Sequence, residues 1–384
     1  MNFKLLVLGL LVTTLACSVA PPDNIGFVTR LGNDTLAVEV FEQTADGFKA
    51  QVVLRSPHTE LTRYELVKTE DGGIASLSAQ TLTDGTDFTG TFSETFTATK
   101  MGDSLRLSMR MGNGENRIFT TPYSPGVLPF IDMVHWPFEL ALINSEASGA
   151  DSVNQKMLSG RFISNFIIAD VGGNKRTIRH PSRGVMDVEV GADGRLMMLD
   201  AAQTTRKLVV TREQGIDINA IARRFLKLDA AGKSFGELSG AITQEFEAGG
   251  ASFRVEYGAP LKRGRDLFGG IVPYGERWRT GANRATHFST SADLMVGNLR
   301  VPAGDYTLFT IPEADGGTLI INKQTGQNGR SYDESRDLGR VPMQVRTKTD
   351  VTETFTITVT EADGGAALNL IWGNTVYFIP FEIR

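Results

Sequence analysis

The segment from Tyr257 to His287 concentrates basic side chains inside an otherwise acidic chain. It holds six basic residues and two acidic ones, whereas the whole sequence has a formal net charge of −5 at pH 7. Glycines and prolines interrupt it, which is typical of a long shaped loop. Arginine presents a planar fork to carboxylate or phosphate and stacks on aromatic rings, so such a loop could bind an anion or a sugar. The candidate ligand-binding residues are Arg263, Arg265, Tyr274, Trp278, Arg279, Asn283 and His287.

The same residue types also have a purely structural interpretation. Arginines brace irregular loops by pairing with carboxylates and backbone carbonyls, which need partners wherever regular hydrogen bonding is missing. Arg279 and Asn283 flank the small-residue turn Thr280-Gly281-Ala282, which can bring their two polar side chains to one point. The sequence leaves both interpretations open, and the exposure of Arg279 separates them.

Catalytic chemistry has less support in the residue pattern. With a single cysteine in the chain and the histidines far apart, no zinc-ligand spacing exists, and we expect no metal and no cofactor. An enzyme interpretation keeps the same loop as a hydrolase site, with His287 as general base and with Arg279 and Asn283 stabilising negative charge. No nucleophile can be assigned to it. The four histidines are His58, His135, His180 and His287.

From about Ala241 to Arg384 the chain resembles the domain of unknown function 2911 family, which occurs in exported bacterial proteins. The string Trp278-Arg-Thr-Gly-Ala-Asn283 is the most specific match, and the stretch from Val301 to Pro312 continues it. The resemblance implies a β-rich exported module with no established reaction. Further matching pieces are Tyr257-Gly-Ala-Pro260, Arg263-Gly-Arg265, Phe268-Gly269, Val272-Pro-Tyr-Gly275, Asn322-Lys323, Tyr332 and Trp372.

Alternating apolar and polar residues predict a mainly β protein. Short alternating runs separated by turn residues begin at Ile25 and indicate a curved antiparallel sheet, with one helix near 137–146 packed on it. Residues beyond Gly240 continue in strands and indicate an antiparallel β-sandwich or jelly-roll-like domain. Between them, Asp217 can cap an amphipathic helix.

These patterns divide the chain into five parts. We expect a lipoprotein signal peptide over 1–17, a tether over 18–24, an antiparallel β domain over 25–212, a linker helix and linker over 213–239, and the β-sandwich domain over 240–384. We recognise no family resemblance in the β domain over 25–212. Its outline is similar to the curved half-barrels of bacterial lipoprotein carriers, an analogy of shape only.

The N-terminus has the features of an export signal. Lys4 precedes an apolar run from Leu5 to Val12, and Leu15-Ala16-Cys17 resembles a lipobox, in which the cysteine is acylated. Cys17 is the only cysteine, so an intrachain disulfide is excluded. We therefore expect a protein of the bacterial cell envelope, anchored to the membrane through lipid on Cys17.

Three functions fit this organisation. The first is a non-catalytic envelope lipoprotein that binds a small polar or anionic ligand, a glycan among the candidates, through the 263–287 loop. The second is an envelope hydrolase that uses this same loop. The third is a lipid or lipoprotein carrier that works through its N-terminal domain. The acidic net charge gives no reason to expect nucleic acid as a partner, and protein partners cannot be read from the sequence.

Overall fold

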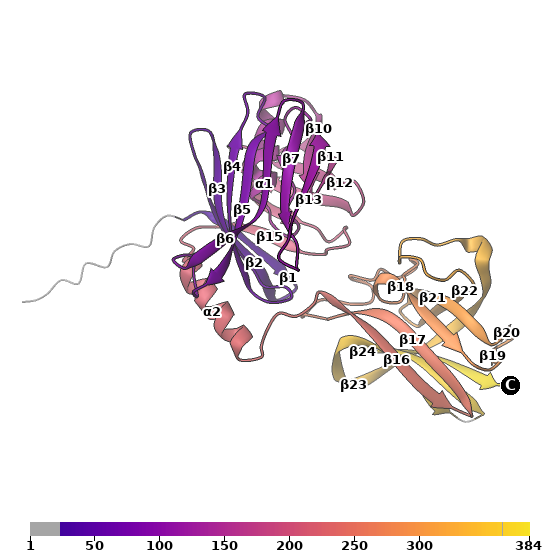
Figure 1. Cartoon of the computed structure of the whole chain (residues 1–384). Coiled ribbons are helices and arrows are strands. Elements are labelled where there is room, and N and C mark those ends of the chain that lie inside the picture. The colour runs from indigo at the N-terminus through magenta and orange to yellow at the C-terminus, as the bar shows by residue number, and fades with distance from the viewer. Residues whose placement is uncertain (1–23, 363) are drawn as a thin grey trace, which may run out of the picture.

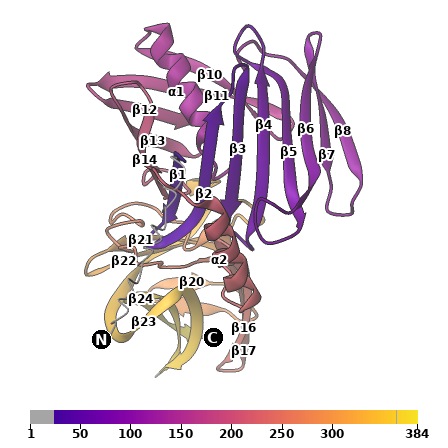
Figure 2. The same ribbon diagram turned by 90° about the vertical axis from the view of Figure 1, so that its left-hand side faces the viewer.

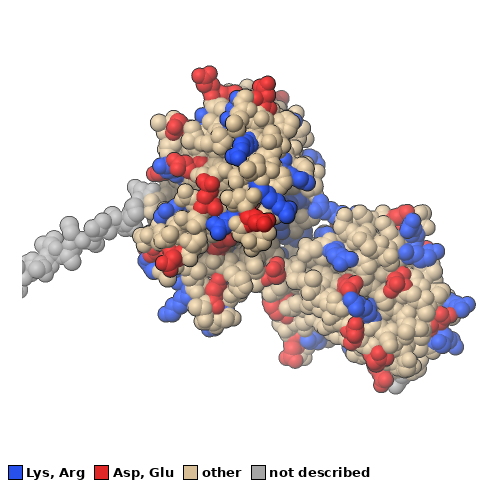
Figure 3. Space-filling model, viewed as in Figure 1, with Lys and Arg blue, Asp and Glu red and all other residues tan. Residues whose placement is uncertain are grey.

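The computed structural model describes residues 24–362 and 364–384. Strands make up most of this part of the chain and form two separate antiparallel sheets, which confirms the predicted mainly β fold class. The two sheets belong to two domains that lie side by side (Figures 1 and 2). Charged side chains of both signs are scattered over both domains on the face that Figure 3 shows.

The N-terminal domain is built on one curved sheet of fifteen strands. Neighbouring strands pair antiparallel, except that β9 runs parallel to β10. The order across the sheet is β8-β7-β6-β5-β4-β3-β2-β1-β15-β14-β13-β12-β11-β10-β9. The strands are β1 (Gly26–Leu31), β2 (Asp34–Gln43), β3 (Gly47–Leu54), β4 (Glu60–Lys68), β5 (Ile74–Asp84), β6 (Thr91–Met101), β7 (Ser104–Arg110), β8 (Asn116–Pro122), β9 (Leu128–Pro129), β10 (Ser152–Ser159), β11 (Phe162–Gly172), β12 (Lys175–His180), β13 (Gly184–Val190), β14 (Leu196–Asp200) and β15 (Val209–Glu213).

Helix α1 (Trp136–Ser148) lies between the two halves of this sheet (Figure 2), where the sequence predicted a packed helix. Pro137 stands in its first turn, where a missing N–H is not needed. Trp136 packs on Phe48 of β3 with ring centroids 6.1 Å apart, and Phe138 packs on Phe166 of β11 at 5.9 Å. The helix therefore joins both halves of the sheet in one hydrophobic core.

A carboxylate from another element holds the start of α1. The fully buried Glu39 of β2 accepts hydrogen bonds from the backbone N–H groups of His135 and Trp136, both at 2.9 Å. These N–H groups have no partner inside the helix, and the positive end of the helix dipole favours an anion there. The contact fixes the helix against the sheet.

Helix α2 (Ile218–Ala230) covers the other face of the sheet. Asp217 caps it, accepting from the N–H of Ala220 at 2.9 Å, as the sequence predicted. The apolar stripe of the helix, with Ala222 and Phe225, packs against Val38 and Val53. The helix expected in the linker is therefore part of the N-terminal domain.

The C-terminal domain is a nine-stranded antiparallel sheet that folds back on itself. The order is β16-β17-β18-β21-β22-β23-β24-β19-β20, yet Leu261 after β17 bridges to Thr354 of β23, which lies far from β17 in that order. Side chains from both parts of the sheet share one core. The elements are β16 (Ser239–Ala248), β17 (Ala251–Pro260), β18 (Ala282–Thr290), β19 (Leu294–Val296), β20 (Leu299–Val301), β21 (Gly304–Glu313), β22 (Gly316–Asn322), the short helix η1 (Glu334–Arg336), β23 (Asp337–Ala362) and β24 (Gly365–Ile383).

The two domains touch at the turn between β1 and β2. The N–H of Asn33 donates to the carbonyl of Arg263 at 3.0 Å, and the Arg263 guanidinium pairs with Asp34 at 2.6 Å. Gly32 permits this approach, since a Cβ there would lie 1.9 Å from the Arg263 carbonyl oxygen. The connecting segment 231–238 is also held, because the N–H of Gly236 donates to the carbonyl of Pro57 at 2.9 Å.

Candidate functional site

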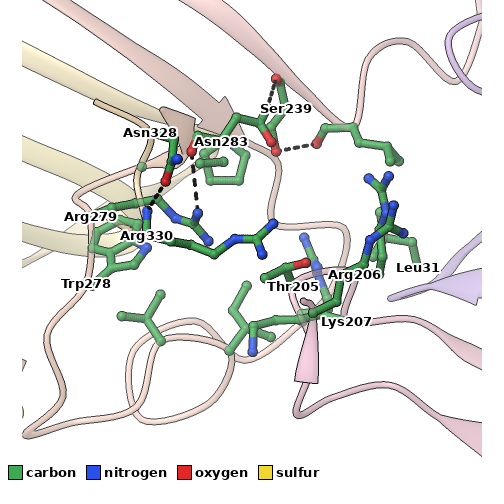
Figure 4. Close-up of a pocket in the computed structure, with 18 of the residues that line it drawn as sticks. Leu31, Thr205, Arg206, Lys207, Ser239, Trp278, Arg279, Asn283, Asn328 and Arg330 are labelled. Atoms are coloured by element: carbon green, nitrogen blue, oxygen red, sulfur yellow. Dashed lines mark hydrogen bonds between the residues drawn. The ribbon is translucent and has the colours of Figure 1, made fainter. Parts of the chain in front are cut away.

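A cleft of about 670 Å³ lies where the two domains face each other (Figure 4). The N-terminal domain contributes the end of β1, the loop between β12 and β13, and the loop between β14 and β15. The C-terminal domain contributes the loop between β17 and β18, the start of β18 and the loop after β22. The lining includes cationic, hydroxyl and amide side chains and one tryptophan: Arg183, Thr205, Arg206, Lys207, Arg265, Trp278, Arg279, Asn283, Asn328, Arg330 and Ser331.

The charge of the lining is entirely of one sign. Six cationic side chains line the cleft, and no aspartate or glutamate of the described residues does. The cations come from both domains: Arg183, Arg206 and Lys207 from the N-terminal domain, and Arg265, Arg279 and Arg330 from the C-terminal domain. In an acidic protein, this local excess of positive charge is a feature of the cleft and not of the composition.

Two of the six cations form ion pairs with a carboxylate. Asp132 pairs with Arg183 at 2.5 Å and also with Arg206. These two arginines hold Asp132 between them and lower the pKa of its carboxyl, although burial acts to raise it. One carboxylate cannot neutralise two guanidinium groups, so this pair keeps a net positive charge.

Backbone carbonyls hold the other four cations. Arg265 donates to the carbonyls of Lys262 and Leu261, at 3.1 and 2.5 Å, and Lys207 donates to the carbonyl of Ala202 at 2.9 Å. Arg279 reaches the carbonyl of Asn283 at 3.5 Å, and Arg330 donates to the carbonyl of Ser182 across the domain boundary. A carbonyl orients a cation without cancelling its charge, so these four side chains are positioned and remain positive.

The cations also act on one another. Burial lowers the pKa of Lys207, and the nearby Arg265 and Arg279 lower it further, against the opposing effect of Glu276. Burial likewise lowers the pKa of Arg279, and Arg330 adds to the shift. Positive charges that are partly removed from water and repel one another are stabilised by an anion between them.

Local backbone geometry places Arg279 at the cleft. Its side chain passes over Gly329, where a Cβ would lie 2.2 Å from the Arg279 Cδ. Asn283 has a φ of 62°, and its carbonyl accepts from the N–H of Gly329 at 3.0 Å. The turn between them therefore brings both polar residues to one place, as the sequence predicted. Trp278 forms the adjoining wall and stacks on Trp372 with centroids 6.1 Å apart.

Four of the seven candidate residues thus meet in the cleft: Arg265, Trp278, Arg279 and Asn283. Tyr274 does not line it, and its side chain is 41% exposed on the surface. Arg279 is only partly buried and has no carboxylate partner among the described residues.

Arg263 has a different position. Its guanidinium is buried, pairs with Asp34, donates to the carbonyl of Phe235 at 3.0 Å and lies 3.8 Å from the centre of the Phe235 ring. It joins the two domains and does not line the cleft. For this residue the structure matches the bracing interpretation of loop arginines.

His287 is also outside the lining. Its Nε2 accepts from the N–H of Gly326 at 2.8 Å, and its Nδ1 lies 2.8 Å from the carbonyl oxygen of Ala285. Backbone groups therefore occupy both ring nitrogens. This arrangement leaves neither nitrogen available to act as a general base toward the cleft.

Sequence reasoning missed four of the six cations: Arg183, Arg206, Lys207 and Arg330. Three of them come from loops of the N-terminal domain, at a distance along the chain from the basic segment. The basic pair Arg206-Lys207 next to a turn was the one available signal.

The remaining expectations concern parts of the chain other than the cleft. Cys17 and the signal segment fall outside the described residues. In the described part of the chain, no group of three or more histidine, cysteine or carboxylate side chains is arranged to hold a metal ion. No helix there is long and apolar enough to span a membrane.

Comparison with known proteins confirms the resemblance of the C-terminal region. Residues 239–381 match the family described as "Protein of unknown function (DUF2911)". No curated protein matches the chain significantly. Among solved structures, a DUF1089 family protein from Pseudomonas aeruginosa is 12% identical, with 44% of this chain and 90% of that chain covered and a TM-score of 0.30. A receptor binding domain is 8% identical, with 95% and 94% covered and a TM-score of 0.15. Similarity this low supports no argument about fold or function.

Proposed function

We propose that this protein is a non-catalytic lipoprotein of the bacterial cell envelope that binds a small anionic ligand, glycans included, in the cleft between its two domains. The observation that carries the proposal is the lining of six cationic side chains without a carboxylate among the described residues. Clefts lined by one sign of charge concentrate ions of the opposite sign. Guanidinium groups held ready by carbonyls lose little freedom when an anion arrives.

The alternatives have less support from the geometry. A hydrolase in this cleft would lack the base assigned to it, since backbone groups occupy both nitrogens of His287. A lipid carrier would need a cavity on the concave side of the N-terminal sheet. That side is filled by α1, and the cavity beside Phe138 and His180 measures only about 30 Å³. A larger hollow of about 690 Å³ lies on β2 to β5, but most of its lining is polar or charged, with Glu42, Lys49 and Arg63 among the lining residues, whereas an acyl chain requires an apolar lining.

Thermal unfolding tests the proposal directly. Pyrophosphate and a galacturonate trisaccharide should raise the melting temperature, and neutral maltotriose should not, with ionic strength matched throughout. Binding at a hundred times the dissociation constant stabilises the folded state by about 2.7 kcal/mol. Arg279→Gln should reduce the shift. The proposal fails if neither anion raises the melting temperature above the matched salt.

The anchor is tested separately. Mass spectrometry of the mature protein should find acyl chains on Cys17, and Cys17→Ala should release the protein from the membrane fraction. An unmodified mature N-terminus would contradict the anchor and leave the cleft proposal untouched.

A further inference from the structure

The cleft cations form two groups that face each other across the domain boundary. Arg206 and Lys207 belong to the N-terminal domain, whereas Arg279 and Arg330 belong to the C-terminal domain (Figure 4). Arg265 of the C-terminal domain also lines the cleft. The contact of Arg330 with the Ser182 carbonyl shows that side chains of one domain reach the other. An anion placed between the groups would interact with both domains at once.

The number of positive charges indicates the charge of the ligand. Asp132 offsets only one of the charges on Arg183 and Arg206, and carbonyls rather than carboxylates hold the remaining cations. A single carboxylate would leave most of this charge unbalanced. A phosphoryl group carries up to two negative charges at neutral pH and offers three acceptor oxygens in a tetrahedral arrangement. It can accept from several guanidinium groups at once.

The rest of the lining indicates an organic part with hydroxyl groups. Hydroxyl and amide side chains lie beside the cations at Thr205, Asn283, Asn328 and Ser331, and Trp278 forms an adjoining wall. Asn283 Nδ2 already donates to the Ser239 carbonyl at 3.1 Å, and Asn328 Oδ1 accepts from the N–H of Arg330 at 2.9 Å. The Asn283 Oδ1 as acceptor and the Asn328 Nδ2 as donor remain for sugar hydroxyls, which both donate and accept. The volume of about 670 Å³ lies within the range of small-molecule sites and exceeds the needs of a bare phosphate ion.

We infer that one phosphorylated saccharide bridges the two domains, with its phosphate between Lys207 and the pair Arg279 and Arg330, and its sugar beside Asn283 and Asn328. This inference rests on the proposed function and narrows it in two ways. It assigns the anion to the phosphate-ester class, and it makes the N-terminal domain half of the binding site.

Calorimetry on the full chain with glucose 1-phosphate tests both parts. We expect one site per chain and binding in the order glucose 1-phosphate, then inorganic phosphate, then glucuronate, with glucose undetectable. Lys207→Gln and Arg279→Gln should each weaken the binding of glucose 1-phosphate about tenfold or more, the usual effect of losing one charge-assisted hydrogen bond. Lys175→Gln and Arg277→Gln are matched controls outside the cleft lining and should bind as the wild type does.

The outcomes separate the inference from the proposal beneath it. If Arg279→Gln weakens binding and Lys207→Gln does not, the bridge is overturned and an anion site in the C-terminal domain remains. If glucuronate binds as tightly as glucose 1-phosphate, the phosphate-ester class is overturned. If no anion binds, the proposed function itself fails. Should Arg279→Gln fail to fold, the exposed Arg330→Gln takes its place.

The phosphorylated sugar could be free or attached to a lipid, and a second arm distinguishes these sources. Vesicles of phosphatidylcholine with 5 mol% phosphatidylinositol 4-phosphate present the group on a lipid. Binding to these vesicles that soluble glucose 1-phosphate competes away, and that Lys207→Gln weakens, supports a lipid headgroup in the same cleft. Binding of the soluble sugar phosphate alone supports a free ligand.

Discussion

The role of an arginine in this protein depends on the group that its guanidinium contacts. Arg263 and Arg279 belong to the same basic segment, yet Arg263 pairs with a carboxylate while Arg279 reaches only a carbonyl. The first joins the two domains, and the second keeps an unpaired positive charge at the cleft. The type of residue does not decide between these roles, whereas the partner does.

The stability of the folded protein should depend on pH through His180, which lies near the cleft. His180 packs edge-on against Phe166 with ring centroids 4.8 Å apart. Burial and then the neighbouring Arg183 lower its pKa from 6.5 to about 4, although Asp132 acts in the opposite direction. Between these values the unfolded chain binds a proton that the folded chain resists. Stability is therefore unaffected above about pH 6.5 and falls as the pH drops toward 4.

Urea unfolding at pH 7 and pH 4.5 measures this effect. From pH 7 to pH 4.5, the free energy of unfolding of the wild type should fall by about 2 kcal/mol more than that of His180→Gln. This figure includes a discount for the partial exposure of the ring. Parallel losses in the two proteins would show that His180 does not titrate in this way.

The basic segment was visible in the sequence, and four of the seven residues proposed from it lie in the cleft, although only two of the six cleft cations are among them. Arg279 and Asn283 meet because a short turn joins them, and such local geometry can be read from spacing. Lys207 and Arg330 could not be found in this way, because they approach through the packing of one domain on another. No periodicity in the sequence records which loops of two domains will face each other.

At the scale of elements, the sequence predicted helices and strands best where the signal depends only on neighbouring residues. The Asp217 cap and the apolar stripe of α2 predicted that helix, since both are local features. They did not predict what the stripe covers. A stripe indicates that one face is buried, and only the fold shows that the partner is the sheet with Val38 and Val53 rather than the linker.

The attachment of α1 through Glu39 gives a prediction at this scale. Glu39→Leu leaves the N–H groups of His135 and Trp136 buried without an acceptor and should lower the free energy of unfolding by about 2–4 kcal/mol. Glu39→Gln keeps an acceptor oxygen and should cost about half as much.

Urea unfolding at pH 7 compares these variants with a control on the same strand. Glu42 of β2 is exposed, so Glu42→Leu should stay within about 0.5 kcal/mol of the wild type. If Glu39→Leu is as stable as that control, the carboxylate does not hold the helix in place.

At the scale of the whole molecule, a ligand site between domains requires the domains to keep their relative position. The contact of Asn33 and Asp34 with Arg263 provides this, together with the bond from Gly236 to Pro57. The sequence predicted that the end of the segment 213–239 is a linker between the two domains. Composition alone does not reveal that this segment is held by hydrogen bonds and that Phe235 is buried in the N-terminal core.

Gly32 offers a test of whether the domain contact supports binding. It has a φ of 61°, and a Cβ there would lie 1.9 Å from the backbone oxygen of Arg263, so Gly32→Ala must push the two domains apart. Gly102→Ala is a matched control, because Gly102 has a φ of 59° with nothing within 4 Å of its Cβ position. Both variants carry the same backbone strain, about 1 kcal/mol, and only Gly32→Ala disturbs the contact. Gly32→Ala should increase the radius of gyration in X-ray scattering, expose segment 231–238 to protease and weaken anion binding, while Gly102→Ala should match the wild type in all three. Equal anion affinity in the two variants, with the domains separated only in Gly32→Ala, would show that one domain binds the anion alone.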